Sequence, residues 1–242
     1  MLKLSRRAFL YDAGVLSAAL ALGACSETSP GDATPEVSLM RGTPAVVPPG
    51  LDPGYALMYA SVEGERFPVP AADLAKINPA FLRSEVAYPT PEPPGTIVVD
   101  PAARYLYFIG EGGMATRYGV GVGKEGFGWS GVATINSKQE WPDWYPPPEM
   151  IARRPDIEKQ LVELQSGKGV AGGLRNPIGA RGMYLWQNNK DTLFRIHGTI
   201  EPQTIGQSVS SGCIRMINQD VIHLYARVAV GTQVKVLPAK TA

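Results

Sequence analysis

Several short runs along the chain are rich in apolar, β-branched or aromatic side chains, and in some of them, such as 233–237, apolar and polar residues alternate. Alternation over about four to eight residues is typical of β-strands. The pattern predicts strands at residues 96–100, 105–109, 114–122, 132–137, 182–186, 192–197 and 233–237. A Pro-Ala-Ala-Arg turn joins the first two into a predicted hairpin. The sequence therefore predicts a mostly β protein.

Helical patterns are few and short. They occur at residues 71–77, 156–164 and 221–228. The second has apolar side chains at positions i, i+4 and i+7. The third follows a candidate cap, Asn218 or Asp220, and precedes Gly231, which would stop it. Residues 55–62 have the composition of a further strand, and residues 188–191 that of a turn.

The composition is that of an ordinary globular chain. Its 242 residues are enough for one domain with extensions. The formal net charge of +1 gives no reason to expect a nucleic-acid partner. The 27 glycines and 22 prolines favour a loop-rich β architecture.

Residues 1–25 have the pattern of an export signal. Three basic residues, Lys3, Arg6 and Arg7, precede an apolar stretch at 13–24. This stretch is too short to span a bilayer, which needs about 20 residues. The string SRRAFL resembles the twin-arginine consensus, so we expect export through the Tat route. The alternative is an ordinary basic region and the Sec route.

The string LGAC at 22–25 resembles a lipobox. Lipidation of Cys25 would make the chain a membrane-anchored lipoprotein of the periplasm or cell envelope. The alternative is ordinary cleavage near Ala24. Either way Cys25 lies outside the folded domain, so we expect no disulfide with Cys213, the other cysteine.

The remaining chain divides by composition. Residues 26–50 are rich in proline, serine, threonine and glycine and are predicted as a flexible tether. Residues 51–94 are predicted as an N-terminal extension packed on the main domain, which we place at 95–238.

The candidate chemistry lies in residues 191–216, which contain His197 and Cys213. A thiol attacks acyl carbons well only as the thiolate, so it needs a base or an electropositive pocket. His197 ends an apolar strand and is followed by Gly198. Gly212 precedes the thiol and would let backbone amides face an oxyanion. We therefore predict a cysteine nucleophile with a histidine base.

Other interpretations of these residues are weaker. Cys213 could be a small buried hydrophobic residue and His197 a satisfied strand-end residue. A zinc site of these two with His223 would lack a fourth ligand and the usual close ligand pairs. Residues 121–126 match G-x-G-x-x-G, but turn residues follow where the dinucleotide motif needs a helix.

Residues 140–150 contain three aromatic residues among four prolines. Trp141 and Trp144 could stack on sugar rings or grip an extended peptide. Equally, they could close one end of the core.

Several strings in this region resemble a known family. They are IHGT at 196–199, IG at 205–206, SSGCIRM at 210–216, and the segments 94–100, 141–144 and 176–181. Together they resemble the L,D-transpeptidase catalytic domain, the YkuD family, and particularly its ErfK/YbiS/YcfS/YnhG group. The resemblance covers about residues 78–238. It implies an antiparallel β-sandwich or flattened barrel with a few short helices.

The resemblance also implies roles for individual residues. Cys213 would be the acyl-accepting nucleophile and His197 the general base and acid. The carbonyl of Gly198 would orient the imidazole, and the amides of Gly212 and Cys213 would form the oxyanion hole.

Further residues would bind the substrate. Arg215 would favour the thiolate or hold a carboxylate, or else form a structural salt bridge. Ser210 and Ser211 are expected to contact the substrate. Many family members have histidine where this chain has Ser211, so His197 is left as the base. Residues 140–175 resemble an insertion that covers the cleft.

The implied reaction is a two-step acyl transfer on peptidoglycan stem peptides. The thiolate attacks the carbonyl of the third stem residue and expels D-alanine. The thioester then passes to an amine, giving a 3–3 cross-link or attachment to a protein lysine. Water as acceptor would make the enzyme an L,D-carboxypeptidase, and a third alternative is a non-catalytic, lipid-anchored wall-binding protein. No metal or organic cofactor is expected.

Overall fold

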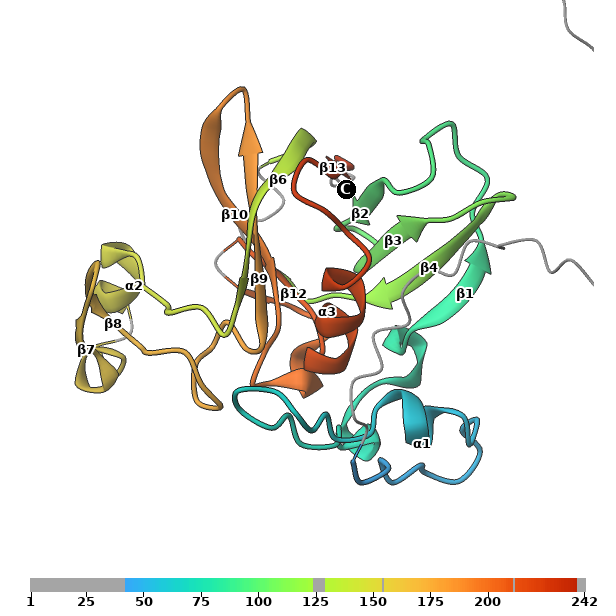
Figure 1. The fold of residues 1–242 in the computed structure, drawn as a ribbon, viewed down its shortest axis with the longest axis horizontal. Coiled ribbons are helices and arrows are strands. Elements are labelled where there is room, and N and C mark those ends of the chain that lie inside the picture. Colours follow the sequence, from blue (N-terminus) through green and yellow to red (C-terminus); the bar gives the residue numbers. More distant parts are fainter. Residues whose placement is uncertain (1–41, 124–128, 154, 211, 239–242) are drawn as a thin grey trace, which may run out of the picture. The chain divides into compact units, whose positions relative to one another are not determined.

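The computed structural model describes residues 42–123, 129–153, 155–210 and 212–238 (Figure 1). They belong to one compact unit at 37–242; the other unit, residues 1–36, lies outside the described residues. The predicted export signal, Cys25 and most of the tether therefore lie outside them too. In the described part of the chain, no helix is long and apolar enough to cross a bilayer.

Strands outnumber helices, as the sequence predicted. The strands are β1 (Ser84–Ala87), β2 (Ile97–Asp100), β3 (Tyr105–Ile109), β4 (Met114–Gly119), β5 (Val122–Gly123), β6 (Gly131–Glu140), β7 (Val162–Leu164), β8 (Gly167–Gly169), β9 (Arg181–Gln187), β10 (Lys190–His197), β11 (Ser208–Ser210), β12 (Ile214–Arg215) and β13 (Gln233–Val236). The α-helices are α1 (Tyr55–Met58), α2 (Pro148–Arg153) and α3 (Asn218–Tyr225). Short 3-10 turns are η1 (Leu74–Lys76), η2 (Pro79–Phe81), η4 (Glu158–Gln160) and η5 (Pro202–Thr204).

One nine-stranded sheet dominates, with the order β1-β4-β3-β2-β13-β6-β9-β10-β12. Its neighbours are antiparallel except for the pairs β2–β13 and β10–β12. At the β12 edge, Arg215 exchanges two backbone hydrogen bonds, of 2.8 and 2.9 Å, with Gly121. Gly121 lies between β4 and β5, near the other edge. The sheet thus closes as a flattened barrel, which confirms the predicted fold class.

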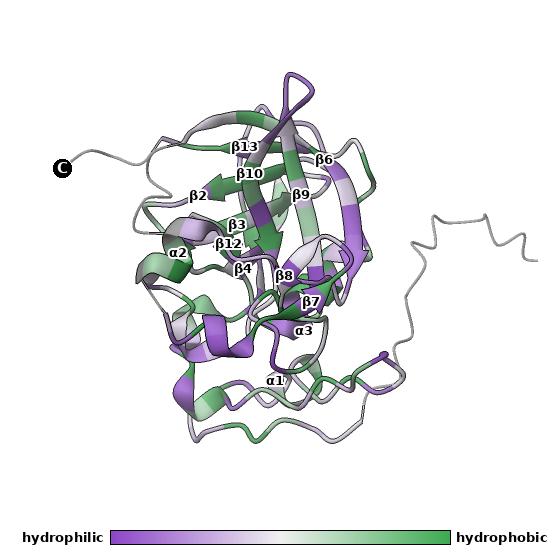
Figure 2. Cartoon of the chain, turned by 90° about the vertical axis from the view of Figure 1, so that its left-hand side faces the viewer, coloured by the Kyte–Doolittle hydropathy of each residue, from purple (hydrophilic) through white to green (hydrophobic). Residues whose placement is uncertain are grey.

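The core of the barrel consists of buried residues of its strands and of α3, a helix that lies beside the sheet (Figure 1). Side chains on a strand alternate between its two faces, so every second residue faces the interior of the barrel. Members of this core include Ile97, Val99, Leu106, Ile135, Leu185, Ile196, Ile214, Val221 and Leu224. Burial of each large apolar side chain contributes about 1.5–3 kcal/mol. The turn between β9 and β10, by contrast, is hydrophilic (Figure 2).

Most predicted strands are confirmed, and so is the 96–109 hairpin, where β2 and β3 pair antiparallel. The predicted helix at 156–164 is wrong: that segment forms η4 and then β7, which pairs with β8. Three apolar residues over so short a run did not outweigh the pairing of Val162 with Gly169. The strand expected at 55–62 is also wrong, because its first half forms α1.

Helix α3 starts earlier than predicted. Ile217 is its N-cap residue, and no side chain caps the helix. Asn218 and Asp220, the predicted caps, lie in the first turn instead, where both side chains make tertiary contacts.

Two further parts surround the barrel. Residues 42–83, here called the N-terminal segment, contain α1, η1 and η2 and lie near the first turn of α3 (Figure 1). They share a second apolar cluster with Ile205 and Ile217. Residues 141–180, here called the insertion, contain α2, β7 and β8 and project from the ends of β6 and β9 (Figure 1).

Candidate active site

The pairing of β10 with β12 brings His197 and Cys213 together. These strands run parallel, with Ile196 opposite Ile214 and His197 opposite Arg215. Both isoleucines are buried in the barrel core. Because side chains alternate, His197 and Arg215 face the other side of the sheet. Cys213 directly precedes β12, and its thiol and the imidazole of His197 both feel the charges of Arg195 and Arg215.

His197 is buried, with 5% of its surface exposed. Its Nδ1 lies 2.6 Å from the carbonyl oxygen of Gly198. A carbonyl can only accept a hydrogen bond, so Nδ1 carries the proton and Nε2 carries the lone pair. Burial lowers the pKa of His197 to about 4, although this hydrogen bond and another to the backbone of Ile178 oppose the shift. The ring is therefore a neutral base at pH 7.

Cys213 is partly exposed and forms no disulfide. Burial of its sulfur raises the pKa of the thiol. A hydrogen bond with the backbone of Arg195 and the charges of Arg195 and Arg215 oppose this rise. The same two guanidinium groups also lower the pKa of His197. The thiol and the imidazole thus share one electropositive environment, in which the resting pair is uncharged.

Arg195 was not identified from the sequence as a site residue. Its guanidinium donates two hydrogen bonds of 2.7 Å to the carboxylate of Asp191. It also lies 4.6 Å from the ring centroid of Tyr184, which faces it on β9. Arg195 lies two residues before His197 on the same strand face, so strand periodicity alone could have identified it.

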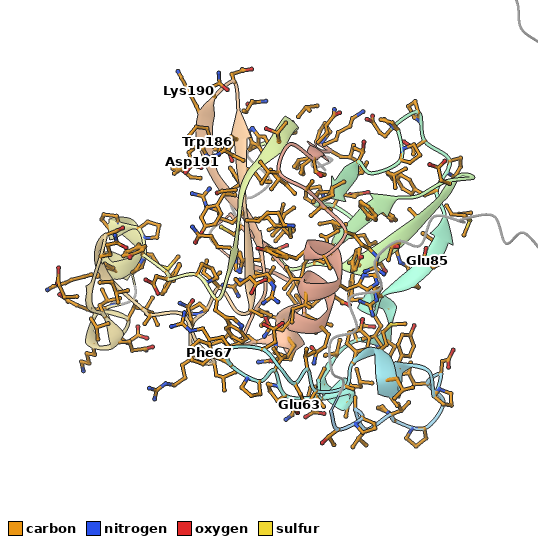
Figure 3. All side chains as sticks on the ribbon, viewed as in Figure 1. Glu63, Phe67, Glu85, Trp186, Lys190 and Asp191 are labelled. Atoms are coloured by element: carbon orange, nitrogen blue, oxygen red, sulfur yellow. The ribbon has the colours of Figure 1, made fainter. Side chains whose placement is uncertain are left out.

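An irregularity in β10 sets this arrangement. The β9–β10 register shifts between Asp191 and Arg195, and Leu193 has a left-handed φ of 64°. Asp191 stabilises the shift because its Oδ1 also accepts the N–H of Leu193 at 2.8 Å. Figure 3 shows Asp191 near the tip of the β9–β10 hairpin. Such bulges re-aim side chains, and they are common beside active sites.

The other predicted residues of the site lie close to Cys213 in the sequence. Arg215 forms a salt bridge of 3.4 Å with Glu201, whose side chain is 55% exposed. Gly212 has a left-handed φ of 135°, which favours glycine. Ser210 lies at the end of β11, and its backbone pairs with Gly123 of β5. Ser211 lies outside the described residues.

Two asparagine side chains organise the loops beside His197. Asn176 is buried; its amide nitrogen donates to three carbonyls of the insertion, those of Pro142, Val170 and Ala171. Its Oδ1 accepts the N–H of Ile178 at 2.9 Å. Asn218 binds Ala180 and Thr199, each at 3.0 Å. The sequence identified the segment 176–181 only by resemblance.

Trp141 is not available to stack on a substrate, because only 3% of its surface is exposed. Its ring packs against Phe67 of the N-terminal segment, and its Nε1 donates to Glu65 at 2.9 Å. The prediction that Trp141 binds substrate is therefore wrong, and the alternative of an aromatic residue that closes the core is correct. Trp144 is half-buried, and its backbone pairs with Val170. Its contact with substrate stays a prediction.

Two other features of this region offer no catalytic group. An apolar pocket beneath Gly212 is lined by Val99, Pro101, Val122, Trp129, Phe194, Ile214 and Val236, all apolar. His223 lies elsewhere, with its Nδ1 2.7 Å from the hydroxyl of Tyr118. Among the described residues, no group of three or more His, Cys, Asp or Glu side chains could hold a metal ion.

Comparison with known proteins gives one consistent family. The model of the L,D-transpeptidase catalytic domain, YkuD, matches residues 94–236, which include every described candidate residue of the site. The probable L,D-transpeptidase ErfK/SrfK of Escherichia coli is 32% identical over 59% of this chain and 44% of its own length. The putative L,D-transpeptidase YkuD of Bacillus subtilis is 48% identical over 33% of this chain and 49% of its own. The chain thus spans about half the length of these relatives.

One similar solved structure is named differently from these relatives. A probable carnitine operon oxidoreductase from Brucella melitensis is 50% identical and covers 66% of this chain and 96% of its own, with a TM-score of 0.45.

Proposed function

The chain belongs to the L,D-transpeptidase catalytic domain (YkuD) family, and we propose that it is a peptidoglycan L,D-transpeptidase with Cys213 as its nucleophile. One observation supports the proposal: at the parallel pair β10 and β12, the thiol of Cys213 and a neutral imidazole share the electropositive environment of Arg195 and Arg215. A nucleophile within reach of a base that a third group orients is the general arrangement of covalent acyl transfer. Here the third group is the carbonyl of Gly198.

In the first step, the sulfur of Cys213 attacks the carbonyl carbon of the third stem residue. Since the resting thiol is protonated, its proton passes to Nε2 of His197 as the carbon–sulfur bond forms. The backbone N–H groups of Gly212 and Cys213 would stabilise the tetrahedral oxyanion. The intermediate collapses by breaking the bond to D-alanine. His197 returns the proton to that amine, and a thioester remains.

In the second step, an amine attacks the thioester carbon. His197 accepts the proton that the amine loses, and the thiol then leaves with that proton, which completes the transfer. Hydrogen bonding to Gly198 keeps one ring nitrogen protonated throughout, so Nε2 alone exchanges protons. A neutral imidazole suits both steps, because an imidazolium could not accept the first proton.

The charges around the site fit a substrate with carboxylates. Arg215 is 20% exposed, and its bond to Glu201 is long for a salt bridge, so a substrate carboxylate can compete for it. Arg195 is more firmly bound by Asp191 and is less available. We therefore assign carboxylate binding to Arg215, and electrostatic support of the thiol to Arg195.

The test uses the full 242-residue chain and a purified disaccharide-tetrapeptide. Intact-protein mass spectrometry should detect an acyl adduct, and product analysis should detect D-alanine and dimers of stem peptides. Cys213→Ala should form no adduct. His197→Ala should lose nearly as much activity, because a protonated thiol without a base is a poor nucleophile.

The products distinguish the acceptors. Dimers support transpeptidation between stems, whereas tripeptide alone supports water or a protein lysine as acceptor. If the folded wild-type chain forms no adduct and releases no D-alanine, the proposal is wrong and a wall-binding role is the better explanation. His223→Ala is the matched control for His197→Ala and should retain activity, since His223 contacts Tyr118 rather than the site.

A further inference from the structure

The first turn of α3 connects the histidine to a distant part of the chain. Its first residue, Asn218, binds two loops at once: Oδ1 accepts the N–H of Ala180, and Nδ2 donates to the carbonyl of Thr199. These residues adjoin the loops whose backbone groups, at Ile178 and Gly198, hydrogen-bond to the imidazole of His197. One amide side chain thus fixes the spacing of both backbone partners of the ring.

The packing around this amide leaves no spare room. A Cβ atom at Gly198 would clash with Oδ1 of Asn218, and the next nearest atom, the backbone nitrogen of Ala180, would lie 3.1 Å away. A Cβ atom at Gly179 would clash with the same oxygen. Real Cβ atoms essentially never make non-bonded contacts this short, so both loop positions need glycine for the amide to fit. Gly179 also has a left-handed φ of 69°. The two glycines and Asn218 therefore form one tightly packed unit beside His197.

The two residues after Asn218 bind the N-terminal segment. Gln219 is buried, and its Nε2 donates to the carbonyls of Ala60 and Pro70 at 3.2 and 2.9 Å. Asp220 is fully buried and accepts the hydroxyl of Tyr59 at 3.1 Å. Consecutive residues of one helical turn therefore hold the histidine loops on one side and the N-terminal segment on the other.

A second link joins the same parts. Glu65 of the N-terminal segment binds Arg181 through hydrogen bonds of 2.6 and 2.9 Å, and both side chains are at most 6% exposed. Arg181 directly follows Ala180, which Asn218 binds. Figure 3 shows Phe67, of the same loop, where the insertion joins the barrel. The N-terminal segment is thus bound at two points next to the histidine loops: the first turn of α3 and Arg181 at the start of β9.

We infer that Asn218 is a positioning residue for His197 and that the N-terminal segment holds Asn218 in place. The N-terminal segment would then be a structural part of the catalytic site and more than a spacer before it. The inference rests on the proposed function only where it concerns acyl transfer; the position and environment of the imidazole can be measured without any substrate.

The experiment uses the two histidines of the chain as probes. NMR titration of the imidazole Cε1 protons follows both, and His223→Ala assigns them. In Asn218→Ala, loosened loops should admit water, so the pKa of His197 should rise from about 4 toward its ordinary value of 6.5. Acylation of Cys213 by the disaccharide-tetrapeptide should slow at least about tenfold in kcat with little change in KM.

Three further variants separate positioning from stability. Gln219→Ala leaves Asn218 intact and should shift the His197 titration in the same direction by less. Asn78→Ala removes an amide that caps an exposed turn of the N-terminal segment, and it should leave the titration unchanged. Asn218→Asp keeps the acceptor for Ala180 and should recover part of the wild-type behaviour, which matters if the alanine variant does not fold.

The outcomes are distinct. If His197 titrates in folded Asn218→Ala as it does in the wild type, the inference is wrong; if that variant does not fold, an unchanged His197 titration in Gln219→Ala overturns the inference instead. A shifted titration in a chain whose wild type forms no acyl adduct would retain the positioning role and overturn the proposed function instead.

Discussion

Two arginines on neighbouring strands both bind a carboxylate, but in opposite surroundings. Arg181 at the start of β9 pairs with Glu65, and the two side chains are 6% and 4% exposed. Arg195 near the end of β10 pairs with Asp191, and these side chains are 16% and 35% exposed. The first pair joins segments 116 residues apart, whereas the second lies within one strand.

The difference in exposure gives the two arginine–carboxylate pairs different roles. A buried charge left without its partner is costly, so the Arg181–Glu65 pair holds the N-terminal segment to the barrel. An exposed pair contributes little to stability. Arg195 can therefore serve the thiol, whose pKa it lowers, without being needed for the fold.

The largest expected effect is on stability at the buried pair. Glu65→Ala removes the carboxylate that binds Arg181 and Trp141 and leaves a buried guanidinium without its partner. We expect the free energy of unfolding to fall by about 3–5 kcal/mol. Asp191→Ala, the same type of change at the exposed pair, should cost about 1 kcal/mol or less. Urea denaturation measures both, and equal losses would contradict the comparison.

The next effect concerns two buried ionisable groups whose pKa values are shifted in opposite directions, so that they change the free energy of unfolding with pH in opposite ways. The pKa of His197 is lowered from 6.5 to about 4 by burial, so its contribution to stability is lost as the pH falls through that range. Burial raises the pKa of Asp220 from 3.8 to about 6, despite the charge of Arg83, so its contribution is lost as the pH rises. Each shift corresponds to about 3 kcal/mol, and in the wild type they largely cancel between pH 4 and 6.

Single variants should reveal how each of the two groups makes the free energy of unfolding depend on pH. Relative to the wild type, His197→Ala should lose stability as the pH rises from 4 to 6, because the Asp220 contribution is no longer offset by that of His197. Relative to the wild type, Asp220→Asn should lose stability as the pH falls from 6 to 4, because the His197 contribution is no longer offset by that of Asp220. Denaturation at several pH values gives the slopes. The opposite sign in either variant would show that the assigned group does not titrate as described.

Strand periodicity made most of the fold predictable. Runs such as 105–109, which are rich in aromatic and branched apolar residues, are typical of strands, and they became the strands of the barrel. The helix predicted at 156–164 failed because a short apolar pattern is compatible with both states, and pairing between β7 and β8 decided it. No local pattern could reveal the parallel pairing of β10 with β12, which depends on the whole barrel.

The candidate site was predictable only where its residues carry chemistry of their own. Cys213 and His197 stood out as a thiol and an imidazole in glycine-containing strings. Asn218 was mistaken for a helix cap, because an asparagine before an apolar run has the same appearance in either role. Glu65 gave no signal, since its partner Arg181 is 116 residues away.

The smallest expected effect on stability, and the most informative for function, is at Arg195. Arg195→Gln removes a guanidinium that lowers the pKa of both Cys213 and His197. Both pKa values should therefore rise, while the free energy of unfolding changes by less than about 1 kcal/mol. The pH dependence of Cys213 alkylation by iodoacetamide measures the thiol, because only the thiolate reacts.

A matched control removes the same charge elsewhere. Arg227 is exposed at the end of α3 and bonds only to the carbonyl of His223 among the hydrogen bonds described for its side chain. Arg227→Gln should leave the alkylation profile unchanged. If Arg195→Gln also leaves it unchanged, the charge on Arg195 has no influence on the thiol, and the Asp191–Arg195 pair serves only to stabilise the bulge in β10. If the profile shifts to higher pH in Arg195→Gln alone, the exposed pair acts on the chemistry and the buried pair on the fold.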